Sequence, residues 1–132
     1  MIIENKRTTP AKRRHSNEES KIQASAVTWF WNTFPQYRGL FIHIPNEGNR
    51  SSKMDGSVRK SLGIVAGAPD TFLFVPKGIF HGLAVEFKTP TGRQSDVQKE
   101  WQEKVESQGY RYVVIRSLED FQHEIENYLS HG

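Results

Sequence analysis

Apolar residues recur at helical spacing in three segments of the chain, residues 16–34, 95–108 and 117–129. Spacing of three and four residues places such side chains on one face of a helix. The first segment ends at Pro35 and the second at Gly109, two residues that commonly stop helices. The expected N-terminal caps are Ser16 or Asn17, the Ser95–Gln98 capping box, and Ser117 with Asp120. The pattern therefore predicts three amphipathic helices.

Short apolar runs between these helices predict four strands. Residues 39–44 form the first, residues 67–89 form two strands around a turn, and residues 110–115 form the fourth. A polar loop follows the first strand, and residues 57–65 are expected to form a helical turn. The step from the third strand through a helix to the fourth is a right-handed crossover between parallel strands. We expect an α/β fold, with a mixed four-stranded sheet flanked by helices on both faces and the order αβββαβ plus a C-terminal helix.

The hairpin carries charges where an apolar core would exclude them. If its turn is centred near Gly78, Asp70 stands opposite Glu86, with Cβ atoms about 5 Å apart. Because side chains alternate along a strand, Glu86 and Lys88 share a face with Asp70. The apolar residues expected on the opposite face are Leu73, Val75, Leu83, Val85 and Phe87.

Two neighbouring carboxylates repel each other unless a cation lies between them. Mg²⁺ is commonly held by one or two carboxylates together with water and substrate phosphate, so the pair predicts a metal and phosphate site. Lys88 could orient or deprotonate an attacking water, or balance charge on the phosphate. The alternative is an ordinary surface pair of Glu86 with Lys88, and Asp70 as a turn residue after Pro69. The apolar run before Glu86 favours the site.

Composition fits one ordinary domain, because 36% of the 132 residues are hydrophobic and 25% are charged. We expect a basic flexible arm over residues 1–15 and a single domain over residues 16–132. The arm either contacts phosphates nonspecifically or is a solvated tail. Without cysteine, thiolate zinc sites and cysteine nucleophiles are excluded. The N-terminal residues resemble neither a secretory signal nor a membrane span, so we expect a cytoplasmic protein.

The residues Pro69-Asp70 and Glu86-Phe87-Lys88 resemble the motif of the PD-(D/E)xK nuclease superfamily. Within that superfamily the sequence is similar to the virus-type replication-repair nuclease (VRR-NUC) family, which has small stand-alone forms in phages and bacteria. The similar segments are IPNEGNR, GIVAGAPD, AVEFKTPTGRQSDVQKEW and GYRYVVIRS. The resemblance extends from about residue 19 to the C-terminus. If the protein is phage-encoded, the expected compartment is the host cytoplasm.

The resemblance implies a phosphodiesterase that depends on Mg²⁺ or Mn²⁺. Asp70 and Glu86 would bind the metal, the Phe87 backbone carbonyl would add a ligand, and Lys88 would assist catalysis. Glu19 matches the acid of the family's first helix, with the alternative that it is an ordinary acid near the helix N-terminus, where the helix dipole favours negative charge. Gln23 lies one turn further on the same side. Gln98 matches a site glutamine of the family, with the alternative that it only closes the Ser95 capping box.

Basic and polar residues around the expected site are candidates for contacts with the DNA backbone. An arginine in the loop before the hairpin could clamp a phosphate through two hydrogen bonds. His43 and His81 lack the spacing of metal ligands, and we interpret both as structural. The DNA-binding candidates are Asn46, Arg50, Arg59, Lys60 and Arg93.

The resemblance therefore predicts a DNA endonuclease, structure-specific for four-way junctions and other branched DNA, that acts as a homodimer. Trp29 and Trp31 are not expected to face the same core, which would leave one of them for a subunit interface. One alternative is a noncatalytic DNA-binding module that kept the nuclease fold. Another is a restriction-type nuclease that reads a short sequence. Base-reading side chains cannot be inferred from this chain, so junction and sequence recognition both stay open.

Overall fold

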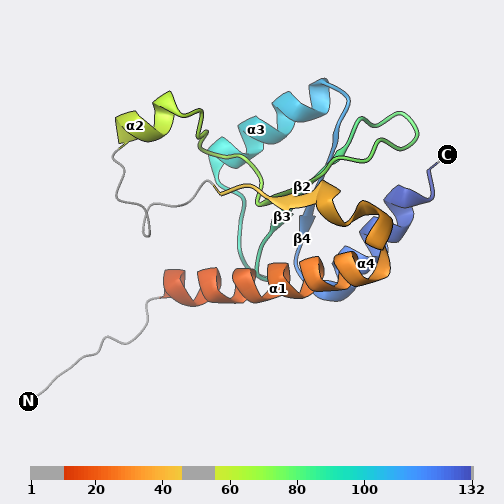
Figure 1. Ribbon diagram of the computed structural model, residues 1–132. Coiled ribbons are helices and arrows are strands. Elements are labelled where there is room, and N and C mark those ends of the chain that lie inside the picture. The colour runs from red at the N-terminus through yellow and green to blue at the C-terminus, as the bar shows by residue number, and fades with distance from the viewer. Residues whose placement is uncertain (1–10, 46–55, 132) are drawn as a thin grey trace, which may run out of the picture.

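Four strands form one mixed sheet in the order β1-β2-β3-β4 in the computed structural model, which describes residues 11–45 and 56–131 (Figure 1). Neighbours from β1 to β3 are antiparallel, and β3 pairs with β4 in parallel. The predicted mixed sheet is confirmed. The elements are α1 (Ala11–Thr33), the 3₁₀ helix η1 (Pro35–Leu40), β1 (Phe41–His43), α2 (Gly56–Ser61), β2 (Thr71–Leu73), β3 (Leu83–Phe87), α3 (Asp96–Ser107), β4 (Arg111–Ile115) and α4 (Leu118–Leu129).

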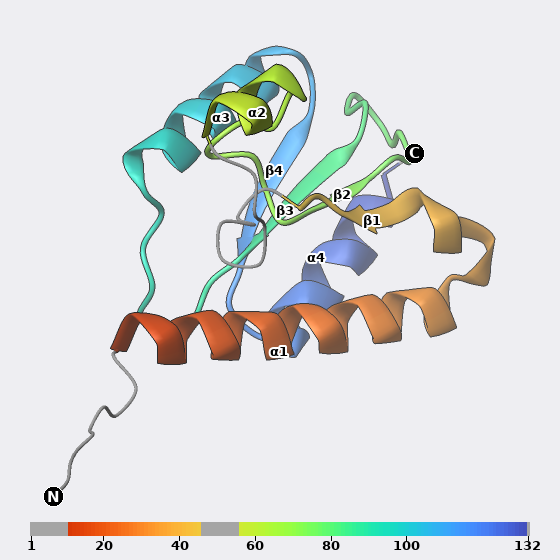
Figure 2. The ribbon, with the colours of Figure 1, turned by 60° about the vertical axis from the view of Figure 1, so that its left-hand side comes forward.

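Helices cover both faces of the sheet, as the apolar strands predicted. α1 and α4 lie on one side and α3 lies on the other (Figures 1 and 2). The large apolar core lies on the α1 and α4 side, and a smaller cluster lies under α3. The large core includes Phe30 of α1, Phe121 and Tyr128 of α4, and the predicted strand residues Leu73, Val75, Leu83, Val85 and Phe87. The smaller cluster is built from Phe72, Ala84 and Tyr112, with Trp101 and Val105 packed against it.

The first helix is longer than its sequence pattern predicted. α1 begins at Ala11, so the expected caps Ser16 and Asn17 lie inside it, and its start was predicted wrongly. Residues 11–14 include alanine, lysine and arginine, which have high helix propensity. Their preference for helix outweighs the lower propensity of Ser16 and Asn17. Residues 1–10 of the expected arm lie outside the described residues. Although α1 has 23 residues, none of the helices in the described ranges is long and apolar enough to cross a membrane.

The chain turns through a 3₁₀ helix before it enters the sheet. Pro35 ends α1 as predicted and occupies the start of η1, where its fixed φ angle fits and its missing N–H is not needed. Gly39 and Leu40, predicted as the start of a strand, belong to η1 instead. The first strand is confirmed, but it is limited to Phe41–His43.

Trp29 and Trp31 both pack against the large core, so the expectation that they could not do so was wrong. The Trp29 ring meets Phe121 of α4 edge to face, with ring centroids 5.9 Å apart. The Trp31 indole N–H donates to the Phe41 carbonyl at 3.2 Å. α1 is flanked by α4 on one side and β1 on the other, so two of its faces are covered. The pair therefore gives no support to a subunit interface.

The register of the hairpin is the one that the sequence predicted. Thr71 stands opposite Val85, and Phe72 stands opposite Ala84. Continuing this alignment by one residue places Asp70 opposite Glu86. The turn itself is closed by Lys77 and Phe80, and Gly78 takes the φ of +57° that favours glycine. The β2 side therefore holds one more residue than the β3 side between the turn and the paired strands. Pro76, which has no N–H to pair, lies in that longer stretch.

Candidate active site

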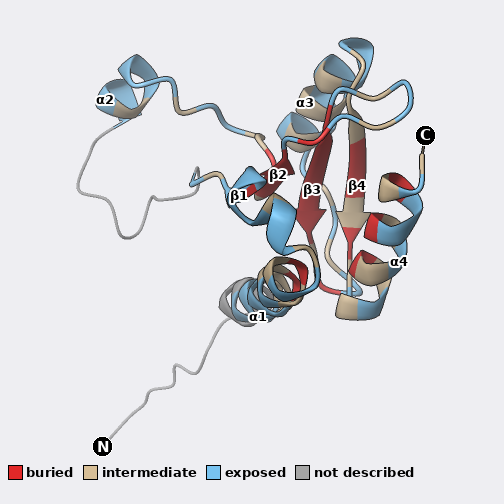
Figure 3. Ribbon diagram, turned by 45° about the vertical axis from the view of Figure 1, so that its right-hand side comes forward, coloured by how far each residue is buried: buried red, intermediate tan, exposed pale blue. Residues whose placement is uncertain are grey.

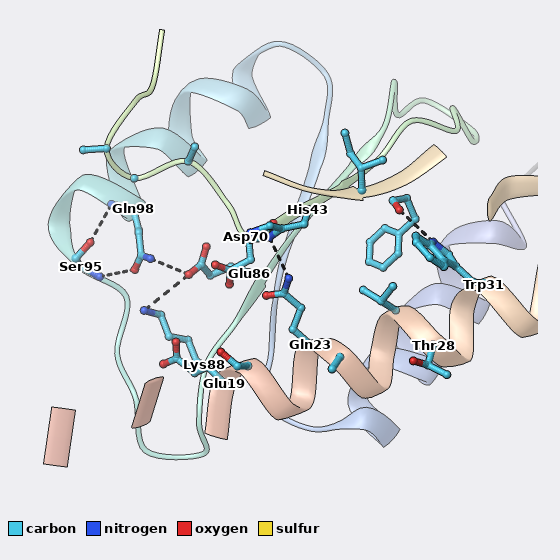
Figure 4. Close-up of a pocket in the computed structure, with 18 residues that line it drawn as sticks. Glu19, Gln23, Thr28, Trp31, His43, Asp70, Glu86, Lys88, Ser95 and Gln98 are labelled. Atoms are coloured by element: carbon cyan, nitrogen blue, oxygen red, sulfur yellow. Dashed lines mark hydrogen bonds and ion pairs between the residues drawn. The ribbon is translucent and has the colours of Figure 1, made fainter. Parts of the chain in front are cut away.

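The β2–β3 pair brings three predicted site residues to one end of the sheet. Asp70 immediately precedes β2, Glu86 is the fourth residue of β3, and Lys88 follows that strand. All three line one open pocket of about 1010 Å³ between α1, β1 and the start of α3 (Figure 4). The remaining predicted residues in its wall are Glu19, Gln23 and Gln98.

Asp70 is fixed through both its side chain and its backbone. Its Oδ2 accepts a hydrogen bond from the Phe87 backbone N–H at 2.8 Å. Its carbonyl oxygen accepts from the Ile44 backbone N–H at 2.8 Å and lies 2.8 Å from Nδ1 of His43. The same nitrogen lies 3.0 Å from Nε2 of Gln23, so His43 Nδ1 stands between a carbonyl oxygen and an amide nitrogen. β3 therefore fixes the Asp70 side chain, and His43 and Ile44 fix its backbone.

Glu86 is a carboxylic acid in the interior of the sheet, with 2% of its surface exposed. Its Oε2 accepts from the Gln98 side chain at 2.7 Å and lies 3.8 Å from Lys88 Nζ. Its buried Oε1 has no hydrogen-bond partner among the residues that the structure describes. An unpartnered buried oxygen is unfavourable, and this one could accept from a ligand in the pocket.

Burial raises the pKa of Glu86 from 4.5 to about 9, and the negative charge of Asp70 adds to the effect. Lys88 acts in the opposite direction, since a nearby cation favours the ionised carboxylate. Figure 4 draws the two carboxyl groups side by side, and this proximity accounts for the effect of Asp70 on the pKa of Glu86. Perturbed acids of this kind cluster at functional sites.

Gln98 closes the Ser95 capping box and also contacts Glu86. Its Oε1 accepts from the Ser95 backbone N–H at 2.9 Å, and the Ser95 side chain accepts in return from the Gln98 backbone. Its Nε2 meanwhile donates to Glu86. The predicted capping box is confirmed, and it fixes the direction of the amide that holds Glu86. No bridging water is required.

Glu19 lies in the same pocket but does not join the two acids in one tight group. Its charge contributes to the raised pKa of Glu86, after burial and the charge of Asp70. Within residues 11–45 and 56–131, however, no group of three or more His, Cys, Asp or Glu side chains is placed to hold a metal ion. The described acids therefore provide a two-carboxylate site with a third acid nearby.

A glycine permits the Asp70 segment to approach α3 closely. Gly67 has a φ of +90°, and a Cβ atom there would lie 2.4 Å from the Val97 carbonyl oxygen. No other residue type avoids both the strained backbone and this collision. Gly67 thus allows the GAPD segment to lie against the helix that carries Gln98.

Arg116 holds the turn between Lys88 and α3. Its Nη1 donates to the carbonyl oxygens of Thr89 at 2.6 Å and Gly92 at 2.7 Å, with Pro90 at 3.5 Å. Gly92 lies beside Glu19, since a Cβ atom on it would be 3.7 Å from Glu19 Oε2. The guanidinium therefore fixes a turn that adjoins Lys88, Glu19 and the start of α3.

The predicted DNA-contact residues are not gathered at the pocket. Arg59 and Lys60 lie on α2, which stands away from the sheet in Figure 3, and Arg93 is exposed on the segment before α3. None of these three lines the pocket. Asn46 and Arg50 lie outside the described residues.

Three residues at or beside the pocket were missed by sequence reasoning. His43, interpreted as structural, contacts the Asp70 backbone and lies 3.0 Å from Gln23. Trp31 forms part of the pocket wall, and Arg116 holds the adjacent turn. The helical spacing from Glu19 through Gln23 to Trp31 was a signal for one shared face. The contacts of His43 and Arg116 join distant segments and left no local signal.

Comparisons with known proteins bear on the family and the fold of the chain. A sequence model of the VRR-NUC domain matches residues 17–119. A solved structure described as a VRR_NUC domain protein is similar, with a TM-score of 0.74 and 24% sequence identity, over 86% of this chain and 89% of the other. That likeness supports the restriction-endonuclease-like α/β fold. No curated protein matches the chain.

Proposed function

Since the chain belongs to the VRR-NUC domain family, which implies a nuclease of the PD-(D/E)xK type, we propose that it is a divalent-metal-dependent endonuclease specific for branched DNA. The observation that carries the proposal is the pairing of the buried Glu86 carboxyl with the half-buried Asp70 carboxyl in one pocket. One oxygen of Glu86 faces no partner in the described residues, although it is buried in the wall of an open pocket.

The donor set fits a hard cation. Carboxylate and carbonyl oxygens are the ligands that Mg²⁺ and Mn²⁺ prefer. Asp70 and Glu86 would supply the carboxylates. The Phe87 carbonyl is the third candidate, because the N–H and C=O of one residue point to the same side of a strand and this N–H already faces Asp70. Bound there, the ion would supply an activated water and positive charge for the leaving oxygen.

The protein's own groups prepare the reaction before any substrate binds. Gln98 holds Oε2 of Glu86 and leaves Oε1 for the ligand. Lys88 lies 3.8 Å from the same carboxylate and projects into the pocket, where its ammonium group can orient a water or neutralise charge on the phosphate. His43 and the Phe87 N–H keep Asp70 in position.

A homodimer is part of the proposal. A two-fold axis would present two pockets to two strands of a four-way junction. Light scattering at micromolar protein concentration tests this point, because we expect a dimer. A monomer with full junction activity would exclude it.

The function is tested with labelled four-way, flap and linear duplex DNA in the presence of Mg²⁺ or Mn²⁺. We expect the branched substrates to be cut and cutting to stop when EDTA removes the metal. Lys88→Ala should lower the rate by about 10²- to 10⁴-fold, the usual contribution of a positioned acid, base or charge. Lys104→Ala, at an exposed lysine of α3, is the matched control and should cut like the wild type.

Three results would contradict the proposal. Equal cutting by Lys88→Ala would remove the catalytic assignment. Binding of DNA without any cutting, in the presence of either metal, would instead indicate a noncatalytic module. Preference for one linear sequence over branched DNA would favour a restriction-type enzyme.

A further inference from the structure

The pocket extends well beyond the carboxyl groups, along the seam between α1 and β1. Its α1 wall begins at Glu19 and ends at Trp31. Because an α-helix rises 1.5 Å per residue, this wall is about 18 Å long. The catalytic groups proposed above occupy one end, and the other end has no assigned role.

The α1 wall changes from polar to apolar along its length. Glu19 and Gln23 face the carboxyl end, whereas Val27 and Trp31, with Thr28 beside them, line the far end. Apart from Thr28, these residues follow one another at spacings of four, so they lie on a single stripe of the helix. The change in polarity therefore runs along one continuous wall.

β1 forms the opposite wall and repeats the same change. Its polar residue His43 lies 3.0 Å from Gln23, and its apolar residue Phe41 accepts from the Trp31 indole through its carbonyl at 3.2 Å. Ile42, which is 42% exposed, lines the pocket between them. The seam thus joins a polar half to an apolar half.

Lys88 lies at the carboxyl end of the pocket. Arg38 does not line the pocket, and its guanidinium lies over the Trp31 ring, 5.4 Å from the ring centre. A nucleic acid strand alternates anionic phosphates with flat, largely apolar bases. A charged group at one end of the pocket and an apolar wall at the other match one step of that alternation.

We propose that the apolar half of the pocket, formed by Val27, Trp31, Phe41 and Ile42, binds an unpaired nucleobase of the strand whose phosphate lies at Asp70 and Glu86. Bases in a duplex are stacked and paired, so their faces are not available to a protein groove. A base beside a branch point or flap is free to enter, and stacking on aromatic side chains accepts any base. The inference rests on the proposed nuclease function and specifies its substrate as DNA with unpaired nucleotides beside the cut.

Trp29 provides an internal control for Trp31. Both are half-buried tryptophans of α1 that pack against the same core. Trp31 lines the pocket, whereas Trp29 packs against Phe34 and Phe121 and does not line it. Loss of either ring removes core contacts, but only loss of Trp31 should change how the substrate is recognised.

The first experiment compares cutting of two branched DNAs that differ only in their unpaired nucleotides, which carry bases in one and are abasic in the other. We expect the wild type to cut the base-bearing DNA about 5-fold to 150-fold faster, the range of one base stacked on an aromatic ring. Trp31→Leu should bring this ratio close to one. Trp31→Phe, which keeps an aromatic ring but loses the indole hydrogen bond, should retain most of it.

Trp29→Leu should keep the wild-type ratio, even if the variant is less stable. The ratio compares two substrates with the same enzyme preparation, so the amount of folded protein cancels. An equal loss of the ratio in Trp29→Leu and Trp31→Leu would overturn the proposal.

The second experiment measures binding without cleavage. In the W29F/W101F variant, Trp31 is the remaining tryptophan, and its fluorescence is followed in EDTA during titration with hexathymidylate or an abasic hexamer. We expect quenching by hexathymidylate and much less by the abasic chain. Thermal unfolding of the variant confirms that the measured protein is folded.

The outcomes separate this inference from the function on which it rests. Quenching by hexathymidylate without cleavage of any DNA would support the base-binding groove and contradict the nuclease. Cleavage with equal rates on base-bearing and abasic DNA would keep the nuclease and overturn the groove. A dimer that dissociates in Trp31→Leu, with no discrimination between the two DNAs, would identify a second copy of the chain as the occupant.

Discussion

On one face of β3, Leu83, Val85 and Phe87 are fully buried against the core under α1 and α4. The other face presents Ala84 and Glu86 toward α3 and the pocket. All five residues of the strand are buried, yet one of them is a carboxylic acid with a raised pKa. Adjacent positions of a single strand therefore have opposite environments.

The contrast between the two faces of β3 indicates how the fold accommodates a buried carboxylic acid. Within the described part of the chain, the core on the α1 and α4 side contains 13 buried residues, whereas the cluster under α3 contains three. Apolar burial stabilises a domain roughly in proportion to buried area. We infer that the large core supplies the stability that permits an acid with an unpartnered oxygen on the opposite face.

The largest expected effect comes from removing a side chain of the large core. Phe87→Ala should lower the free energy of unfolding by about 3–5 kcal/mol, because the lost ring leaves a cavity that the sheet cannot close. The control is Phe74→Ala, at a ring that is 53% exposed, which should lower it by less than about 1 kcal/mol. Urea unfolding measures both. Equal losses of unfolding free energy in Phe87→Ala and Phe74→Ala would show that the two faces of the sheet do not differ in apolar stabilisation.

The second prediction concerns the acid on the pocket face. The folded protein keeps Glu86 protonated up to a pKa of about 9, whereas the unfolded chain ionises near 4.5. Between these values the native state binds a proton that the unfolded state has released, so stability falls as pH rises. Glu86→Gln removes this linkage, and its stability should vary less with pH over the same window.

Chemical unfolding in EDTA between pH 5 and pH 9 measures this effect for both proteins. The metal must be absent, because a bound cation would favour the ionised acid. Parallel stability curves for the wild type and Glu86→Gln would show that Glu86 is not the group responsible.

The smallest expected effect concerns the turn that follows Lys88. Arg116→Ala leaves the Thr89 and Gly92 carbonyls without their donor and should lower the free energy of unfolding by about 1–3 kcal/mol. Arg111→Ala is the control. It removes a partly exposed ion pair with Glu124 at 3.1 Å, and such pairs contribute at most about 1 kcal/mol.

Thermal unfolding and junction cutting should be measured together for these two arginine variants. Because the turn adjoins Lys88 and the start of α3, we expect Arg116→Ala to lower cutting more than Arg111→Ala does. A larger loss of cutting in Arg111→Ala than in Arg116→Ala would show that the turn held by Arg116 does not support the site.

Local patterns were sufficient for most of the elements. The alternation along the hairpin predicted its register and the face of each strand residue, and the Ser95–Gln98 pattern predicted the capping box. The start of α1 and the 3₁₀ helix before β1 were missed. Boundaries are less certain because several residues at a helix end have similar intrinsic preferences.

The sequence by itself determined that Asp70 and Glu86 stand at opposed strand positions, because a two-residue period and one turn fix the alignment. The tertiary structure alone decided that Gln98 holds one oxygen of Glu86, that His43 supports Asp70, and that Trp31 extends the pocket. Those contacts join segments that are distant along the chain. Their geometry depends on how helices pack on the sheet, which no local pattern specifies.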